Sequence, residues 1–244
     1  ALGAKDPLFS IFYGYDSPAA MAGQAVVQTF HFADNQAEAY YYFPGQRRVR
    51  RMPTYNYDAP QIGFENQYTV DEPWLFNGDI DRFEWKLVGK KEMYVPYNNF
   101  AMYDFRKSVG DVFKNDMVDA AARRYELHRV YVVEAKLKSN MRHISQKKVL
   151  YLDEDTYLAL VGEDYDAQGK LWKTKEGYPI PLWELGGTCD IEPFTQYNLL
   201  AGRYVNDQTV IGAGQDVHYF ETSNDPRFAA NYYSAENLRS ISER

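Results

Sequence analysis

The chain has 244 residues, a formal net charge of -7 at pH 7 and one cysteine, Cys189. The negative charge excludes a general nucleic-acid binder, because such proteins need basic surfaces, while one cysteine excludes an intramolecular disulfide and leaves the redox compartment open. No apolar run reaches the roughly 18 residues of a membrane-spanning helix, so we expect a chain that does not span a membrane.

The first part of the chain is predicted to form three short strands after an extended entry segment. Apolar residues alternate in residues 24–33, residues 34–36 (DNQ) form a turn, and Glu38–Phe43 returns as the partner strand. Residues 46–52 form a third run that carries four arginines. These arginines are interpreted as a solvated strand end, with contact to an anion or a lipid headgroup as the alternative. The opening residues lack a charged region followed by an apolar core, so no signal peptide is expected in this chain.

An irregular segment, residues 53–78, is predicted to cover one face of the sheet. A loop of this length inside a compact domain is uncommon, and such loops are often functional or mobile. Its aromatic residues would expose on the order of several hundred square ångströms of apolar surface if they stayed in water. We therefore predict a packed lid that contains Tyr55, Tyr57, Phe64, Tyr68, Trp74 and Phe76.

The rest of the chain is dominated by a predicted antiparallel β-meander. Apolar and polar residues alternate with a period of two, and the joints are short and polar, so neighbouring strands must run antiparallel. Gly89 marks a bulge in the first strand. The strands are expected at residues 83–97, 127–137, 147–153, 157–166, from 170 onwards, 191–199 and 203–211. Short helical turns are expected at residues 98–106, 109–124, 183–185 and 235–241, the last capped by Ser234.

Signals for catalysis and metal binding are weak. Residues 164–169 resemble the start of an EF-hand, but Lys175 stands where the bidentate Glu belongs, and a hairpin turn with Gly169 in the left-handed region explains the same residues. The acidic turn at residues 153–155 is interpreted as solvated surface, and the histidines at 31, 128, 143 and 218 show no ligand spacing. We predict no metal, no cofactor and no catalytic residue, and hence no enzyme. A hydrolase with an unrecognised acid pair is the weakest alternative.

Three stretches resemble a known family. They read PGQRRVRRMPTYNYDAP, FNGDIDRFEWKLVGKKEMYVPYN and RYELHRVYVVEAKLKSNMRHI with YLDEDTYLALVGEDYDAQGKLWK. Together they are similar to a Gram-negative bacterial family of unknown function that is often labelled outer-membrane lipoprotein-sorting protein. The likeness is dense from about residue 24 to residue 173, and the family supplies no established catalytic residues.

The resemblance implies a LolA/LolB-like fold and a periplasmic location. Together with the strand pattern, it predicts a β-dominated α+β fold: a single curved antiparallel sheet that forms an open half-barrel, with a few short helices. Residues 1–244 are assigned to a single domain. Because family members are longer and carry a signal peptide, this domain is expected to be the C-terminal part of a longer precursor.

A function is also implied, because relatives of this fold hold lipid acyl chains. We predict non-enzymatic binding or carriage of a lipid or other hydrophobic ligand in the periplasm, in the service of an envelope export system and its membrane proteins. The alternative is a scaffold that binds an envelope protein or glycan through a Tyr-rich sheet. The ligand is expected on the concave face, although each residue could also be plain core: Trp85, Met93, Tyr131, Val133, Tyr151 and Trp172.

Overall fold

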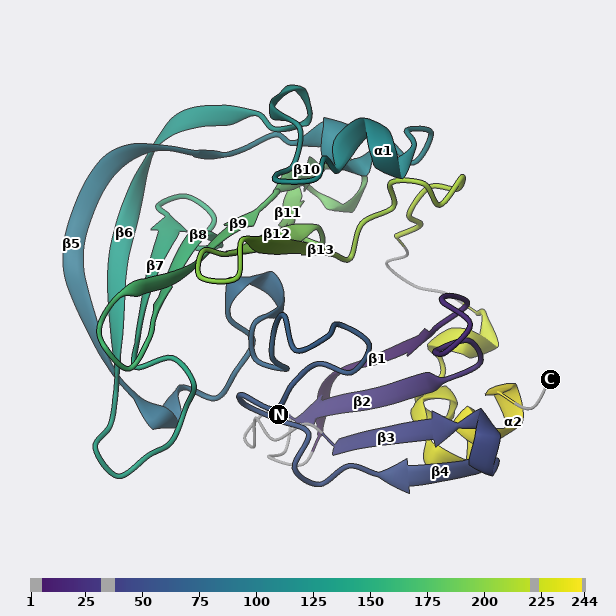
Figure 1. Ribbon diagram of the computed structural model, residues 1–244. Helices are drawn as coiled ribbons and strands as arrows, with labels where there is room; N and C mark the ends of the chain where they lie inside the picture. Colours follow the sequence, from purple (N-terminus) through teal and green to yellow (C-terminus); the bar gives the residue numbers. More distant parts are fainter. Residues whose placement is uncertain (1–5, 32–37, 220–223, 243–244) are drawn as a thin grey trace. The chain divides into compact units, whose positions relative to one another are not determined.

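The computed structural model describes residues 6–31, 38–219 and 224–242 (Figure 1). The chain forms two compact units, one from residues 1–59 and 220–244 and the other from residues 60–219. The assignment of all residues to one domain stays a prediction. No helix in the described part of the chain is both long and apolar enough to cross a membrane.

The first unit is a four-stranded antiparallel sheet in the order β1-β2-β3-β4. Its strands are β1 (Pro7–Gly14), β2 (Ala25–His31), β3 (Glu38–Phe43) and β4 (Arg48–Arg51), with the turn η1 (Pro44–Gln46) before β4. The C-terminal elements η7 (Pro226–Phe228), η8 (Ala230–Tyr233) and α2 (Ala235–Ser242) complete the unit, and Leu238 of α2 is buried against Ala25, Val27 and Tyr42. The predicted strand Glu38–Phe43 is therefore confirmed, whereas the predicted turn at residues 34–36 lies outside the described residues.

The arginines of β4 lie at the edge of this sheet. Arg48, Arg50 and Arg51 are exposed. Arg51 Nη2 lies 3.3 Å from Glu38 Oε1, and Arg50 Nη2 donates to Gln46 Oε1 at 2.5 Å. These local pairs fit the interpretation of a solvated strand end, and exposed cations at an edge also oppose pairing with another sheet.

The second unit contains a seven-stranded antiparallel sheet in the order β13-β12-β9-β8-β7-β6-β5. Strands that follow one another in sequence are paired, as predicted, except where β12 pairs with β9 across the small β10–β11 hairpin. The strands are β5 (Phe83–Pro96), β6 (Tyr125–Leu137), β7 (Lys147–Asp153), β8 (Ala159–Tyr165), β9 (Leu171–Gly177), β10 (Ile180–Leu182), β11 (Thr188–Asp190), β12 (Phe194–Asn198) and β13 (Arg203–Asp207).

The β-dominated antiparallel fold with few short helices is thus confirmed, but its strands lie in three sheets instead of one. Prolines at positions 53, 60 and 73 interrupt the segment after β4. Proline cannot donate a backbone hydrogen bond to a ladder, so the first sheet does not continue into the second. In the second unit β5 and β6 are long and strongly curved (Figure 1), and the register of β5 shifts between Leu87 and Gly89, at the predicted bulge.

Short helical elements connect these strands. They are η2 (Pro73–Leu75), η3 (Ile80–Arg82), η4 (Phe100–Tyr103), α1 (Val109–Val112), η5 (Ala120–Ala122) and η6 (Trp183–Leu185). The turns expected at residues 98–106 and 183–185 are present as η4 and η6. A capping box fixes the start of α1, because Ser108 and Asp111 exchange side-chain to backbone hydrogen bonds.

Residues 60–78, here called the cover segment, pack on one face of the large sheet. Tyr68 and Leu75 of this segment are 1% and 0% exposed, and they form a cluster with Leu150 and Phe194 of the sheet. Phe64 and Phe76 pack against the same cluster. The predicted lid is therefore confirmed for this part of the segment. We call this side of the sheet the covered face and the other side the opposite face.

The opposite face carries an apolar core. Val130, Val149, Tyr151 and Leu160 are buried there, with Val95 from the curved end of β5. A further cluster, which includes Met102, Val112, Tyr178 and Ile211, joins η4 and α1 to the same unit. Both faces of the sheet are consequently shielded from water over much of their area.

Candidate functional site

A large hollow of the second unit lies between η4, β10 and η6. It has a volume of about 690 Å³. Phe100 and Trp183 expose 52% and 72% of their surface there, above the buried side chains of Ile180 and Leu182. We call this hollow the Trp183 pocket. Its lining residues are Phe100, Ala101, Tyr103, Asp104, Phe105, Arg106, Ile180, Pro181, Leu182, Trp183, Glu184, Leu185, Asp216, Val217, His218 and Tyr219.

Two charged side chains at the Trp183 pocket are fixed to each other. Arg106 donates from Nε to Asp104 Oδ1 at 2.8 Å and from Nη2 to Asp104 Oδ2 at 3.2 Å. The hydrogen bond from Arg106 lowers the pKa of Asp104, and the same pairing raises the pKa of Arg106. Since apolar walls with a few fixed polar groups are typical of small-molecule sites, the pocket suits a ligand with an apolar body and a polar end.

The backbone places the pocket through three segments that are distant in sequence. Asn99 N donates to Pro179 O at 3.1 Å, which ties the start of η4 to the start of β10. Tyr103 also donates to the carbonyl oxygen of Tyr178 at 3.1 Å. Residues 216–219 supply the third side. No single motif in the sequence contains these segments, which is why residue patterns did not reveal the pocket.

The six side chains predicted to bind ligand do not share one surface. Strand register places Trp85, Tyr131 and Val133 on the covered face, whereas Met93 and Tyr151 lie on the opposite face. Tyr151 is 8% exposed and belongs to the apolar core, against which Met93 packs. The ligand-binding role of these residues stays a prediction.

The individual side chains predicted to bind ligand also have different contact partners. Trp85 packs edge-to-face on Phe76 of the cover segment, with ring centroids 5.2 Å apart. Tyr131 lies beyond this segment and stacks on Tyr157 at 5.9 Å. Trp172, at the start of β9, donates from Nε1 to Asn198 Oδ1 at 3.1 Å.

Beneath the cover segment lies a buried network of charges that the sequence did not reveal. Three lysines of the covered face meet three carboxylates, and all six side chains are at most 2% exposed. The cations and anions balance in number. The members are Lys148, Lys173, Lys175, Asp71, Glu72 and Asp164.

Two carboxylates of this network each join two lysines. Asp164 Oδ2 lies 3.1 Å from Lys148 Nζ and 2.8 Å from Lys175 Nζ. Glu72 Oε1 lies 3.0 Å from Lys173 Nζ and 3.2 Å from Lys175 Nζ. Lys175 therefore connects a residue of the sheet to a residue of the cover segment.

The third carboxylate, Asp71, is paired with a histidine. His143 Nε2 lies 2.8 Å from Asp71 Oδ2, and His143 Nδ1 accepts from the backbone N–H of Ser145 at 2.9 Å. Because Nδ1 accepts, Nε2 carries the proton and donates to Asp71. Thr69 also donates to Asp71 Oδ1 at 2.6 Å. The carboxylate is satisfied on both oxygens, as a buried charge requires.

The network shifts the pKa of Asp71, Glu72 and Lys175 in the direction expected for ion pairs, whereas burial outweighs Glu72 at Lys173 and lowers the pKa of that lysine. Burial alone would raise the pKa of Asp71, but the hydrogen bond from His143 and the charge of Lys148 lower it to about 2. Burial would likewise raise the pKa of Glu72, yet Lys175 and Lys173 hold it well below its usual range. Asp164 and Glu72 together outweigh burial and raise the pKa of Lys175. Closed off from solvent and balanced in charge, the network holds the cover segment on the sheet.

Comparison with known proteins agrees with this architecture. Residues 1–239 match the family model described as Protein of unknown function (DUF1329). An uncharacterised protein of Pseudomonas aeruginosa is 37% identical over 191 residues, which are 78% of this chain and 42% of that protein. The chain thus spans less than half the length of that relative.

Two solved structures share the fold. A domain named for outer membrane lipoprotein sorting, from Vibrio parahaemolyticus, gives a TM-score of 0.58 at 17% identity and covers 93% of this chain and 76% of that one. A DUF1329 family protein from Desulfovibrio piger gives 0.54 at 16% identity, with 93% and 75% covered. These findings confirm the family resemblance seen in the sequence and, at such identities, show likeness of fold alone.

Proposed function

The chain belongs to the DUF1329 family of proteins of unknown function, and from this premise we propose that it binds a hydrophobic or amphipathic small molecule in the Trp183 pocket without catalysing a reaction. The single observation that carries the proposal is the pair of exposed aromatic residues, Phe100 and Trp183, above the apolar floor of a hollow of about 690 Å³. Sites for small molecules commonly measure 300–1,000 Å³.

An acyl chain is the ligand class that we favour. Each buried methylene contributes about 0.8 kcal/mol, so burial of about 15 methylenes provides about 12 kcal/mol. After an immobilisation cost of about 4 kcal/mol, about 8 kcal/mol remains, which corresponds to micromolar affinity. Arg106 and His218 line the same hollow as these aromatic residues and offer donors to a polar end of the ligand. Arg106 is paired with Asp104, and Glu184 and Asp216 also line the hollow, so a neutral polar end suits it better than an anionic one. The likeness of fold to a domain named for lipoprotein sorting supports this choice. We propose that the binding takes place in the periplasm, in the service of an envelope export system.

The pocket replaces the concave sheet surface as our preferred site. The covered face is filled by the cover segment and by buried charges, which leave an acyl chain no apolar surface at its centre. Trp85 is already packed on Phe76. Of the predicted ligand-binding residues on the covered face, Tyr131 and Val133 are partly exposed and lie farther along the strands than Trp85. These two residues are therefore the ones that a ligand on this face could still reach.

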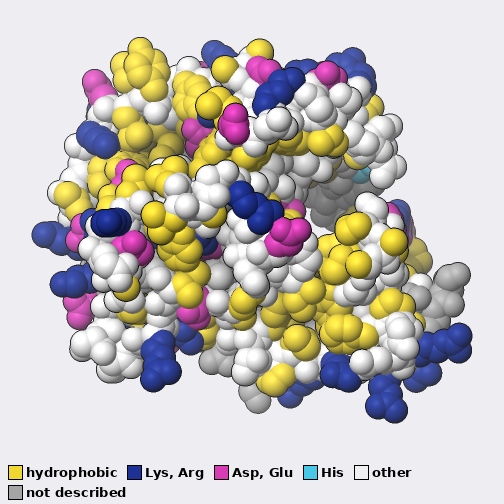
Figure 2. Space-filling model, in the orientation of Figure 1, with side chains coloured by type: hydrophobic (Ala, Val, Ile, Leu, Met, Phe, Trp, Pro, Cys, Tyr) yellow, Lys and Arg dark blue, Asp and Glu magenta, His cyan; other side chains and the backbone are white. Residues whose placement is uncertain are grey.

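A second candidate function, docking to an envelope protein, is favoured by a different observation. Figure 2 shows hydrophobic side chains gathered over β5 and β6. The large apolar residues of this strip are more than half exposed: Leu87 at 59% and Val88 at 57% beside the bulge, and Tyr94 at 69% with its partner Leu127 at 58% farther along the two strands. Exposed apolar patches of this kind mark interaction sites when they are contiguous.

A fluorescent fatty-acid titration of the purified chain separates these functions. We expect saturable binding by the wild type and at least a tenfold loss in the double variant Phe100→Ala/Trp183→Ala. Both side chains are exposed, so the double variant keeps the fold. Tyr94→Ala, which removes an equally exposed ring from the strip, is the matched control and is expected to bind normally.

Other results would redirect or end the proposal. A loss of binding in Tyr131→Asp alone, in protein shown to be folded, would place the ligand on the sheet as the sequence predicted. Absence of any saturable binding by the wild type would remove the carrier function. The docking function would then be the better account.

A further inference from the structure

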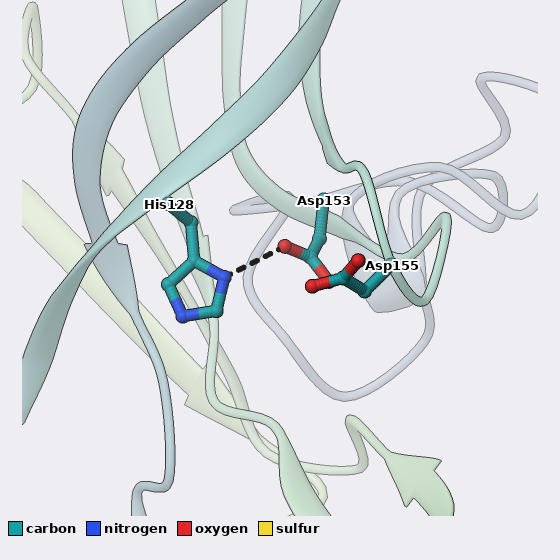
Figure 3. Close-up of side chains that lie close together, drawn as sticks. All are labelled: His128, Asp153 and Asp155. Carbon is teal, nitrogen blue, oxygen red and sulfur yellow. Dashed lines mark hydrogen bonds and ion pairs between the residues drawn. The ribbon is translucent and has the colours of Figure 1, made fainter.

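A group of metal-ligand side chains lies away from the Trp183 pocket, where β6 and β7 meet the turn after β7. His128 comes from β6, Asp153 ends β7, and Asp155 follows in the turn. One ligand atom from each of these residues lies within 4.8 Å of the other two. Figure 3 shows the imidazole ring and the two carboxylates close together.

Two of the three side chains are held in place before any ion arrives. Asp153 is 0% exposed, and its Oδ2 accepts from Thr156 N at 3.0 Å and from Thr156 Oγ1 at 2.9 Å. Its other oxygen, Oδ1, therefore points to His128 Nδ1 at 2.9 Å. The imidazole of His128 stacks on Tyr97, with ring centroids 4.0 Å apart. Such fixed side chains lose little freedom on binding an ion.

The spacing of these atoms suits a small transition-metal ion. Nitrogen and oxygen ligands lie about 2.0–2.2 Å from zinc, so two neighbouring ligands are roughly 3–3.5 Å apart. The 2.9 Å between His128 Nδ1 and Asp153 Oδ1 needs only a small adjustment to reach that separation. An imidazole with two carboxylates favours zinc over calcium, since calcium takes oxygen ligands alone.

The third ligand is available. Asp155 is exposed, and among the described residues its carboxylate forms no hydrogen bond or ion pair. The neighbouring acids are engaged elsewhere: Glu154 pairs with Lys90 and with Arg129. Asp155 can therefore turn toward His128 and Asp153 without breaking another contact.

The surroundings leave room for water or a further ligand on the ion. A cleft of about 370 Å³ opens beside the group, lined by Glu92, Leu127, His128, Arg129, Glu154 and Asp155. On the other side of the ring, Glu126 Oε2 lies 3.8 Å from His128 Nε2. A carboxylate near the outer nitrogen of a metal-bound histidine fixes its tautomer and orients the ring.

We propose that His128, Asp153 and Asp155 bind one zinc ion, through Nδ1 of the imidazole and one oxygen of each carboxylate, with the remaining position open to the cleft. This arrangement of three protein ligands and an open position is the one found in zinc sites that accept water or another small ligand. The sequence interpretation found no ligand spacing for His128 and treated residues 153–155 as solvated surface. It did not foresee this group, because the three side chains meet only through the register of β6 on β7.

The test is calorimetric titration of the untagged, chelator-treated chain with zinc chloride. We expect one equivalent to bind, at least tenfold weaker binding in Asp155→Asn, and no saturable binding in His128→Gln. Asp166→Asn, which changes a partly buried acid in the β8–β9 turn and keeps an oxygen to accept from the backbone there, is the matched control and is expected to bind as the wild type does. Cobalt as a substitute ion gives visible absorption bands whose intensity reports the coordination number of the bound ion.

The outcomes are decisive in both directions. A stoichiometric site that is lost in the two ligand variants, with unchanged circular dichroism, supports the assignment. Zinc binding that is equal in wild type, Asp155→Asn and His128→Gln would overturn it, as would saturation by calcium and not by zinc. Since Asp155 is exposed and forms no hydrogen bond or ion pair within the described part of the chain, its replacement keeps the fold and the test stays valid even if His128→Gln is unstable.

Discussion

The two faces of the seven-stranded sheet are both buried over much of their area, but with different chemistry. The opposite face packs apolar side chains such as Val130 and Leu160. The covered face carries three lysines and an aspartate of the sheet, closed by two carboxylates of the cover segment. Apolar packing is a sum of many small contacts, whereas a buried charge is tolerated only when its partner is in place. The comparison teaches that the opposite face depends on packed volume, whereas the covered face, which also holds an apolar cluster, depends in addition on charge pairing.

The sharpest test of this difference removes one charge from the covered face. Glu72→Gln keeps the shape of the side chain but leaves Lys173 and Lys175 with less negative charge beside them. We expect the free energy of unfolding, measured with urea, to fall by about 3–5 kcal/mol, the cost typical of an uncompensated buried charge.

The same chemical change elsewhere in the cover segment supplies the control. Glu65 pairs with Arg203 at 2.7 Å, but the two side chains are 74% and 54% exposed. Glu65→Gln is expected to change stability by less than about 1 kcal/mol, because exposed ion pairs contribute little. Equal losses in the two variants would show that pairing is not what the covered face depends on.

On the opposite face we expect a loss that follows volume. Leu160 is 0% exposed in the apolar core, and Leu160→Ala should destabilise the protein by about 2–4 kcal/mol through lost contacts and the cavity left behind. Leu127→Ala, at a position 58% exposed, is the control and should be close to neutral. If Leu160→Val recovered none of the loss, volume would not be the controlling quantity.

Low pH should reduce the stability contributed by the covered face, by an amount smaller than the losses expected from the substitutions above. The folded pKa of Asp71 is lowered to about 2, below its usual value of 3.8. A lowered folded pKa gives stability that is present above the unfolded value and is lost as the pH falls through the folded value. Asp71 should therefore contribute about 2 kcal/mol that disappears between about pH 4 and pH 2.

A comparison of urea midpoints over this pH range checks the acid prediction. Asp71→Asn should flatten the acid dependence of the unfolding free energy, whereas Leu160→Ala should lower the curve and keep its slope. An unchanged acid slope in Asp71→Asn would contradict the role given to this carboxylate.

Local patterns were sufficient for much of the fold. The predicted bounds of Glu38–Phe43 and Lys147–Asp153 match the strands, and the bulge at Gly89 was placed correctly. Each of these features depends on neighbours in sequence: alternation, a Pro-Gly break or a polar turn. Division of the strands among three sheets depends on which edges meet, and residue patterns do not contain that information.

The candidate sites depend on partners that are far apart in the chain. Lys173 and Glu72 are separated by 101 positions, so the period of two in β9 could not tell a buried lysine from a solvated one. The Trp183 pocket combines residues 100–106, 180–185 and 216–219. The turn at residues 183–185 was predicted, but its sequence did not indicate which other segments lie next to it in the fold.

The balance of charge under the cover segment also limits how this chain can change over generations. A single replacement among Asp71, Glu72, Asp164 and their lysine partners leaves a charge in the interior without compensation. Since paired or apolar replacement of a buried ion group is far better tolerated than removal of one member, we expect accepted substitutions here to arrive as coordinated sets. In an alignment of relatives, we expect these positions to co-vary.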